Sequence, residues 1–131
     1  MEKFDTIVKF TFKKSERLSS KKDIQELFKN GSSFYLYPFN VITLPASDVK
    51  MHQVLFTVPK RNFKRAVDRN LLKRRMREAY RLHKHLLPTE PQVLCIAYIY
   101  TSKEIVDYES IAKPLEQSLS RIKKYVEKSN K

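Results

Sequence analysis

The 131-residue chain has one glycine, one cysteine and no long apolar run. Because Gly31 is the sole glycine, a glycine-rich phosphate loop cannot form, and the Rossmann and P-loop classes are excluded. A lone cysteine, Cys95, excludes an internal disulfide and a multi-cysteine metal site. The longest apolar run, residues 93–100, is far shorter than the roughly 20 residues of a membrane-spanning helix.

Export signals and the usual constellations of catalytic residues are missing as well. The first residues, Met1-Glu-Lys-Phe-Asp, include acids and no apolar segment, so we predict no signal peptide. The simplest location is then the cytoplasm, with no membrane contact. The few acids and histidines indicate no Ser-His-Asp set, no close pair of carboxylates and no cluster of metal ligands. We therefore predict no catalytic residue and no metal site in the protein itself.

Positive charge is what the chain has in abundance. Its 27 Lys and Arg outnumber 14 Asp and Glu, which gives a formal net charge of +13. Hydrophobic residues still make up 41% of the chain, enough to fill a core, and the length is typical of one domain. A folded domain with this excess charge predicts a polyanionic partner, with nucleic acid ahead of an anionic membrane or an acidic protein.

Apolar residues at helical spacing predict three helices. They cover residues 20–30, residues 66–84 and a C-terminal segment whose apolar stripe consists of Ile111, Leu115, Leu119, Ile122 and Val126. In the first helix, Ser20 and Asp23 have the spacing of a capping box, and Gly31 is expected to end the helix in a left-handed conformation. Pro114 lies inside the third pattern, so that helix either begins near residue 112 or is kinked at the proline.

Strands are predicted over residues 34–44, 52–58 and 92–100. The first two are expected to form an antiparallel pair, and the third is a continuous apolar run that is typical of a buried central strand. The order αββαβα predicts an α+β sandwich with helices packed on one mixed sheet. We expect a single domain over residues 18–127, an extended N-terminal tail over residues 1–17 and a frayed C-terminal tail over residues 128–131.

The positive charge is concentrated in the second helix and the loop before it. Residues 60–84 contain eleven basic and two acidic residues, so this window carries +9 of the total and leaves +4 for the rest. At about 100° per residue, the basic residues from Arg65 to Arg81 form one stripe opposite an apolar side. Like charges four residues apart destabilise an isolated helix by roughly 0.2–0.5 kcal/mol per pair, which calls for a counter-charge from outside.

An RNA backbone supplies that counter-charge, and the planar fork of arginine suits phosphates and base edges. The alternative is an ordinary solvated face, but such faces usually mix both signs. We predict that RNA contacts Lys60, Arg61, Arg65, Arg69, Asn70, Lys73, Arg74, Arg77 and Arg81.

Two other classes of nucleic-acid-binding protein also contain a basic helix of this kind. A non-enzymatic RNA-binding module, such as a ribosome-associated protein, would suit a mixed αβ domain with a basic helix equally well. A DNA-binding basic region of the bZIP type requires a heptad zipper after the helix, and Pro88 and Pro91 exclude it. DNA is therefore not expected as a partner.

The basic helix and its entry loop also resemble a known family, the bacterial ribonuclease P protein component. The loop reads Val58-Pro-Lys-Arg-Asn, and the core pattern of the family, R-N-x-x-K-R-x-x-R-E, is matched by Arg69, Asn70, Lys73, Arg74, Arg77 and Glu78. The segment from Arg17 to Gly31 resembles the first helix of the family. Residues 92–100 and 108–126 match its last strand and last helix in type and place.

This resemblance implies a protein subunit that pairs with a large catalytic RNA and helps it remove the 5′ leader from precursor tRNA. By this likeness, hydrolysis uses Mg²⁺ held by the RNA, and the basic helix faces the catalytic RNA. The resemblance also implies a left-handed βαβ crossover around that helix, whereas the general rule for parallel strands predicts a right-handed one.

A cleft between the sheet and the first helix is implied as the site of the single-stranded leader, with Ile24, Phe28 and Phe39 as its candidate residues. The family often has an aromatic residue where this chain has Ile24, which cannot stack on a base as well. Phe28 either stacks on a leader base or belongs to the core, and Phe39 is equally compatible with packing in the sheet.

Overall fold

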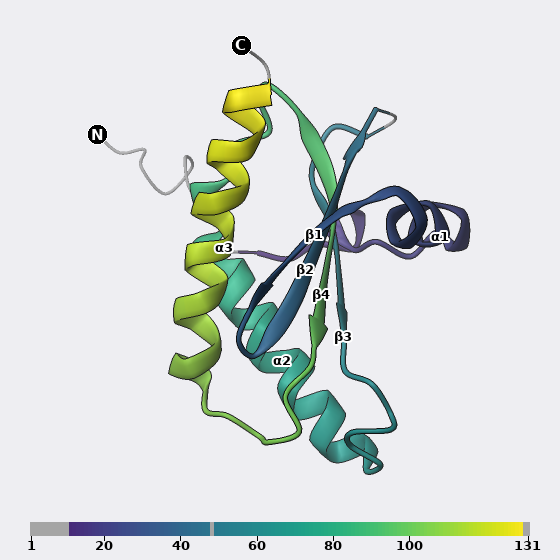
Figure 1. Cartoon of the computed structure of the whole chain (residues 1–131), viewed down its shortest axis with the longest axis vertical. Coiled ribbons are helices and arrows are strands. Elements are labelled where there is room, and N and C mark those ends of the chain that lie inside the picture. Colours follow the sequence, from purple (N-terminus) through teal and green to yellow (C-terminus); the bar gives the residue numbers. More distant parts are fainter. Residues whose placement is uncertain (1–10, 48, 130–131) are drawn as a thin grey trace.

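The computed structural model describes residues 11–47 and 49–129, which form three α-helices and one four-stranded sheet (Figure 1). The predicted tail residues 1–10 and the last two residues, 130–131, lie outside this description. The elements are η2 (Lys14–Glu16), α1 (Lys21–Asn30), β1 (Ser32–Leu36), β2 (Phe39–Ala46), β3 (Gln53–Thr57), α2 (Ala66–His83), η3 (Lys84–Leu86), β4 (Val93–Tyr100) and α3 (Tyr108–Ser129).

The sheet has the strand order β1-β2-β4-β3. Strand β2 pairs antiparallel with both β1 and β4, whereas β3 runs parallel to β4. The sheet is therefore mixed, and the predicted α+β class with helices packed on one mixed sheet is confirmed.

The prediction for residues 34–44 was wrong in one respect, because this segment belongs to two strands rather than one. Strands β1 and β2 form a hairpin that turns at Tyr37 and Pro38, where the peptide bond is cis. The predicted antiparallel pairing with residues 52–58 is also absent, since β4 lies between β2 and β3. The described part of the chain thus forms four strands where the pattern predicted three.

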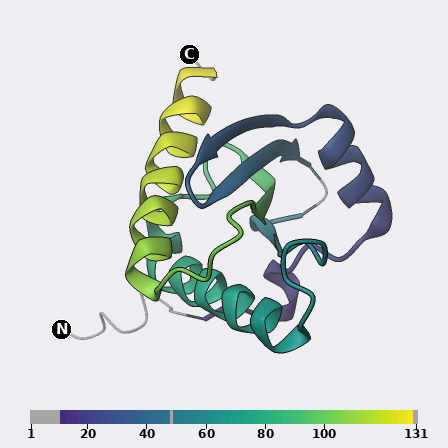
Figure 2. The same ribbon diagram turned by 60° about the horizontal axis from the view of Figure 1, so that its bottom comes forward.

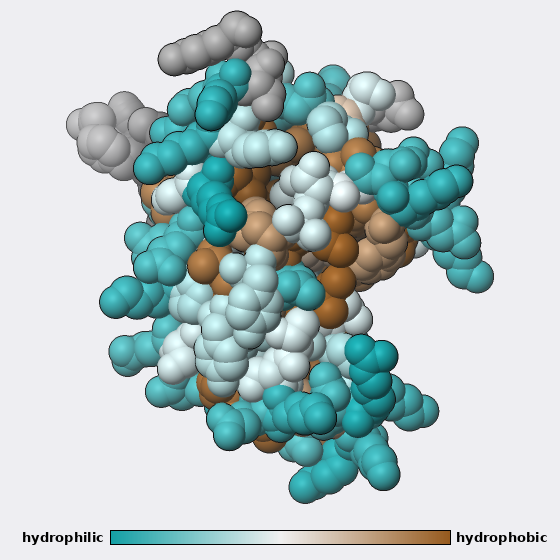
Figure 3. All heavy atoms as spheres, in the orientation of Figure 1, coloured by the Kyte–Doolittle hydropathy of each residue, from teal (hydrophilic) through white to brown (hydrophobic). Residues whose placement is uncertain are grey.

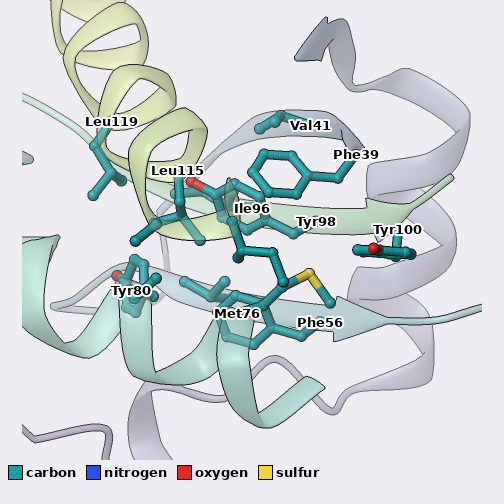
Figure 4. Close-up of a cluster of buried hydrophobic side chains, with 14 of the residues drawn as sticks. Phe39, Val41, Phe56, Met76, Tyr80, Ile96, Tyr98, Tyr100, Leu115 and Leu119 are labelled. Carbon is teal, nitrogen blue, oxygen red and sulfur yellow. The ribbon is translucent and has the colours of Figure 1, made fainter. Parts of the chain in front are cut away.

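Strand β4 lies in the interior of the sheet and is apolar on both sides. Its even-numbered residues, such as Ile96 and Tyr98, face a large core cluster shared with α2 and α3. Its odd-numbered residues Cys95 and Ala97 face a smaller cluster with Leu27 of α1. Helices α2 and α3 therefore cover one face of the sheet and α1 covers the other (Figure 2). Figure 4 shows how Met76 of α2 and Leu115 of α3 meet on the large cluster.

Helix α3 begins at Tyr108, several residues before residue 112, where one of the two predictions placed its start. Asp107 caps the helix, because its Oδ1 accepts a hydrogen bond of 2.9 Å from the backbone N–H of Ser110. Pro114 consequently lies inside the helix rather than in its first turn. The helix continues to Ser129, so the tail predicted to fray from residue 128 is helical for its first two residues.

The N-terminal segment lies against the open edge of β3. The backbone N–H of Leu18 donates to the Val54 carbonyl at 3.0 Å, and Arg17 forms a parallel bridge with the same residue. Glu16 is buried and accepts a hydrogen bond of 2.6 Å from Lys84 Nζ beyond the end of α2. Residues 11–17 are therefore tied to the domain and include a 3₁₀ turn, which differs from a plain extended tail.

The parallel neighbours β3 and β4 are joined through α2, so the βαβ unit that the family resemblance implies is present. Its handedness stays a prediction.

The buried ring of His52, just before β3, connects the start of β3 to β4 and to the segment before β4. Its Nδ1 accepts a hydrogen bond from the Leu94 N–H at 3.0 Å, which leaves Nε2 to donate to the Pro88 carbonyl at 2.9 Å. The bond to Nδ1 requires the neutral ring, because a protonated Nδ1 cannot accept a hydrogen bond.

Gly31 ends α1 as predicted, but for a different reason. Its φ of −74° and ψ of 157° are extended rather than left-handed. A Cβ at this position would lie 2.4 Å from the Leu27 carbonyl oxygen and 2.6 Å from Ile42 Cγ2. Glycine is required here because the end of α1 passes close to β2.

We predict that Gly31→Ala lowers the free energy of unfolding by about 1–3 kcal/mol, as overpacking does. Gly31→Asn should cost at least as much, although asparagine is well tolerated at a left-handed cap. Urea unfolding of both variants measures this, with the exposed Lys29→Ala as control. A stable Gly31→Asn protein would contradict the close approach.

We also predict that His52 makes stability depend on pH. Burial lowers the pKa of His52 below its ordinary value, so between the lowered pKa and about 6.5 the unfolded chain binds a proton that the folded chain does not. The free energy of unfolding should therefore decline as the pH falls below about 6.5. Urea unfolding across this range should show a shallower decline for His52→Gln, and equal slopes would refute the assignment.

Candidate nucleic-acid interface

The loop before α2 is held by a buried aromatic anchor. The backbone N–H groups of Asn62 and Phe63 both donate to the Pro59 carbonyl, which closes a tight turn. The Phe63 ring is buried and lies edge-to-face with Tyr100, with 5.8 Å between the ring centroids. The turn leaves Lys60 and Arg61 exposed at its tip.

Helix α2 lies on the sheet through one apolar side, as its periodicity predicts. Leu72, Met76, Ala79 and Tyr80 are buried in the large core cluster. Arg75 lies at the margin of this side, where its Nη1 donates to the Val106 carbonyl in the segment before α3. These contacts fix the rotation of the helix about its axis and therefore decide which residues face outward.

The outward side of α2 and its entry loop carry the predicted RNA-contacting residues. Arg65, Asn70, Arg74 and Arg77 are exposed, whereas Arg69, Lys73 and Arg81 are half-buried. Figure 3 shows hydrophilic side chains gathered at the lower end of the molecule, where α2 begins. We call Lys60, Arg61, Arg65, Arg69, Asn70, Lys73, Arg74, Arg77 and Arg81 the basic face.

Arg69 differs from the other members of the basic face because the fold already uses it. Its Nη1 donates to the carbonyl oxygens of Phe63 and Lys64, both at 2.8 Å. The guanidinium thus ties the entry loop to the second turn of α2. Sequence reasoning assigned Arg69 to RNA alone, because a hydrogen bond to loop carbonyls leaves no periodic signal.

Arg81 is the member whose charge is offset within the helix. It forms an ion pair with Glu78, and its Nε donates to Glu78 Oε1 at 3.2 Å. The hydrogen bond from Arg81 lowers the pKa of Glu78, and the same bond raises the pKa of Arg81. Among the described residues, by contrast, no carboxylate forms an ion pair with Arg74 or Arg77.

The three candidate cleft residues do not come together. Phe39 is fully buried on the face covered by α2 and α3, edge-to-face with Tyr98 at 5.2 Å between centroids, so its assignment to a leader cleft was wrong. Ile24 packs on the opposite face against the smaller cluster, and Phe28 of α1 is 46% exposed. The alternation of β2 explains the error, because Phe39 and Val41 point to one face and Ile42 to the other.

The part of the chain that the structure describes contains neither a cluster of possible metal ligands nor a candidate membrane-spanning helix. There, no three His, Cys, Asp or Glu residues are grouped so that they could hold a metal ion. No helix of residues 11–47 or 49–129 is long and apolar enough to cross a membrane. The thiol of Cys95 is buried, and this burial raises its pKa, which keeps it protonated and unreactive.

Comparison with known proteins gives a consistent result. The family model "Ribonuclease P" matches residues 12–123. The ribonuclease P protein component of Porphyromonas gingivalis is 40% identical over 119 residues, which cover 86% of this chain and 87% of that protein.

Solved structures agree with this match. The RNase P protein from Thermotoga maritima has a TM-score of 0.68 at 28% identity, covering 81% of this chain and 96% of that one. The Staphylococcus aureus RNase P protein has a TM-score of 0.69 at 24% identity, covering 82% of this chain and 94% of the other, and it shares the fold.

The geometry predicts different outcomes for two arginines of the basic face. Arg74→Ala should leave the unfolding midpoint unchanged and reduce the slope of log affinity against log salt concentration by roughly 0.7–0.9, the value of one phosphate contact. Arg69→Ala should in addition lower the unfolding midpoint, because it frees the entry loop. RNA titrations over a salt series and urea unfolding measure the two effects. Equal stability of both variants would contradict the role of Arg69 in the loop.

Proposed function

The chain belongs to the ribonuclease P protein family, and from this membership we propose that its basic face binds the catalytic RNA of that ribonucleoprotein. As a ribonuclease P protein component, the chain is a subunit of a tRNA-processing assembly and has an RNA partner. A ribosome-associated module, the alternative that its sequence left open, is not favoured. The remaining question is what each surface of the protein contributes.

The observation that carries the proposal is the large excess of positive charge on α2 and its entry loop. Arg74 and Arg77 are exposed, and no carboxylate among the described residues pairs with them. A polyanion that lies along this side would neutralise several charges at once and release its counterions. Arginine forks also offer two parallel hydrogen bonds to a phosphate, which fixes the orientation of the RNA.

We further propose that the RNA, and not the protein, holds the Mg²⁺ used for hydrolysis. The guanidinium and ammonium groups of the basic face repel a divalent cation, and Glu78 of the same helix is already paired with Arg81. The protein then supports cleavage of the 5′ leader of precursor tRNA by binding and positioning RNA. In bacteria such as these relatives, tRNA is made and processed in the cytoplasm, so we propose that location.

The α1 side of the sheet is the proposed contact for the leader. Phe28 projects from α1 with 46% of its surface exposed, so its ring is available to stack on a base, a contact worth roughly 1–3 kcal/mol. Ile24 contributes only apolar contact. Phe39 is excluded from this role by its burial.

Reconstitution with the cognate catalytic RNA tests the proposal. At low Mg²⁺ concentration, the protein should increase the rate of leader removal from precursor tRNA over that of the RNA alone. A charge-reversed variant of the basic face, Arg74→Glu with Arg77→Glu, should lose this stimulation, whereas the exposed pair Lys103→Glu with Lys113→Glu, outside the basic face and the leader contact, serves as the matched charge control. Protein without RNA should cut nothing. No stimulation by the unaltered protein would refute the proposal, and cleavage by protein alone would refute the role of the RNA.

A further inference from the structure

A pocket lies between the C-terminal half of α3 and one end of the sheet, on the face opposite α1. Its volume is about 360 Å³, within the range of about 300–1,000 Å³ that is typical of small-ligand sites. Ser32 and Phe34 of β1, Thr43 of β2 and Arg121 and Tyr125 of α3 contribute to its lining. None of these residues belongs to the basic face or to the proposed leader contact.

The pocket exists because the sheet carries small side chains at this end. Ser32 of β1 is paired with Thr43 of β2, and both lie on the face that α3 covers. Further along the same strand, Phe39 and Val41 fill the equivalent space and are fully buried. Between this small pair and α3 the pocket stays open, whereas large side chains fill the space further along the strand.

The walls of the pocket are flat and aromatic. The guanidinium carbon of Arg121 lies 4.3 Å from the centroid of the Phe34 ring, so the two planar groups form a cation–π pair. The Tyr125 side of the pocket is open to solvent, since this residue is 60% exposed. Leu94 and Ile122, each 3% exposed, add apolar surface to the interior. The hydroxyl groups of Ser32 and Thr43 supply polar atoms at the sheet side.

Planar aromatic and guanidinium surfaces beside hydroxyl groups match one chemical class, a flat heterocycle with polar edges. A nucleobase has such faces and edges, and proteins that bind single-stranded RNA use the same combination of aromatic rings and arginine. The positive charge of Arg121 beside the opening suits the phosphate that follows the base. An aliphatic ligand would make no use of the stacked pair, and an anion alone would make no use of the apolar interior.

We propose that this pocket binds one unstacked nucleobase of an RNA strand, between Tyr125 and the stacked pair of Arg121 and Phe34. The proposal rests on the RNA partner of the family but not on leader removal. It gives the protein a third RNA contact, which recognises a base, whereas the basic face neutralises phosphates. The base belongs either to the catalytic RNA or to precursor tRNA, and the experiment distinguishes the two.

Titration with uncharged nucleosides tests the pocket without any large RNA. Adenosine or uridine added to isotope-labelled protein should shift the backbone amide resonances of Ser32, Thr43 and Leu94, whereas ribose 5-phosphate, which lacks a base, should not. Ser32→Trp, which fills the pocket without changing the net charge, should abolish these shifts. Tyr125→Ala should weaken them and Tyr125→Phe should retain them. The exposed Tyr35→Ala on β1, 55% exposed, is the matched control and should behave as the unaltered protein.

Two RNA arms locate the source of the base. If it comes from the catalytic RNA, Tyr125→Ala should weaken binding of that RNA by about fivefold to a hundredfold, the effect of one lost base stack. If it comes from the substrate, the same variant should instead weaken binding of precursor tRNA to the assembled holoenzyme.

Absence of nucleoside-dependent shifts at the pocket would overturn the proposal, as would shifts that persist in Ser32→Trp. Because the titration needs no catalytic RNA, these outcomes stay separate from the reconstitution above. A holoenzyme that fails to process precursor tRNA would refute the proposed function and leave the pocket result standing.

Discussion

The packing of α2 on the sheet is the interaction on which the rest of the structure depends. Its outer side repels itself, because basic residues recur every four positions and each such pair costs roughly 0.2–0.5 kcal/mol in an isolated helix. Its inner side opposes this with Leu72, Met76, Ala79 and Tyr80, which are buried in the large core cluster that α2 shares with the sheet and α3. Burial of a large apolar side chain contributes about 1.5–3 kcal/mol, so a few such residues outweigh the repulsion. The helix can therefore present concentrated charge without any RNA bound.

The parts of the fold that the sequence predicted well are those with a strong local period. The apolar run of β4, the stripe of α3 and the amphipathic side of α2 each have a period that fits only one type of secondary structure. All three elements lie within a few residues of their predicted bounds. The errors lie where the pattern is continuous or non-local. Residues 34–44 are uniformly rich in apolar and aromatic residues, so nothing but Pro38 marked the turn that divides β1 from β2.

Strand order is the second feature that local pattern could not supply. Nearest neighbours in sequence, β2 and β3, are separated by β4, whose residues are buried in the core clusters on both faces of the sheet. The same alternation decides the candidate site. Helical periodicity placed the basic residues on one side of α2 correctly, yet it could not show that Arg69 also bonds to two loop carbonyls. Phe39 was misassigned because facing direction in a strand changes with every residue, and the sequence alone did not show which face α1 covers.

The two faces of the sheet divide the chemistry of this protein in a way that follows from side-chain size. On the α1 side, β4 contributes the small residues Cys95 and Ala97, so α1 approaches closely and Gly31 is needed where the chain leaves it. On the other side, large aromatics hold α2 and α3 away from the strands, and where these aromatics give way to Ser32 and Thr43 a pocket opens. Phosphate contacts along α2 can position an RNA but carry no information about its bases. A pocket lined by flat side chains can distinguish bases. The residues for phosphate contact therefore lie on α2, those for base recognition lie on β1, β2 and α3, and each set can change without altering the other.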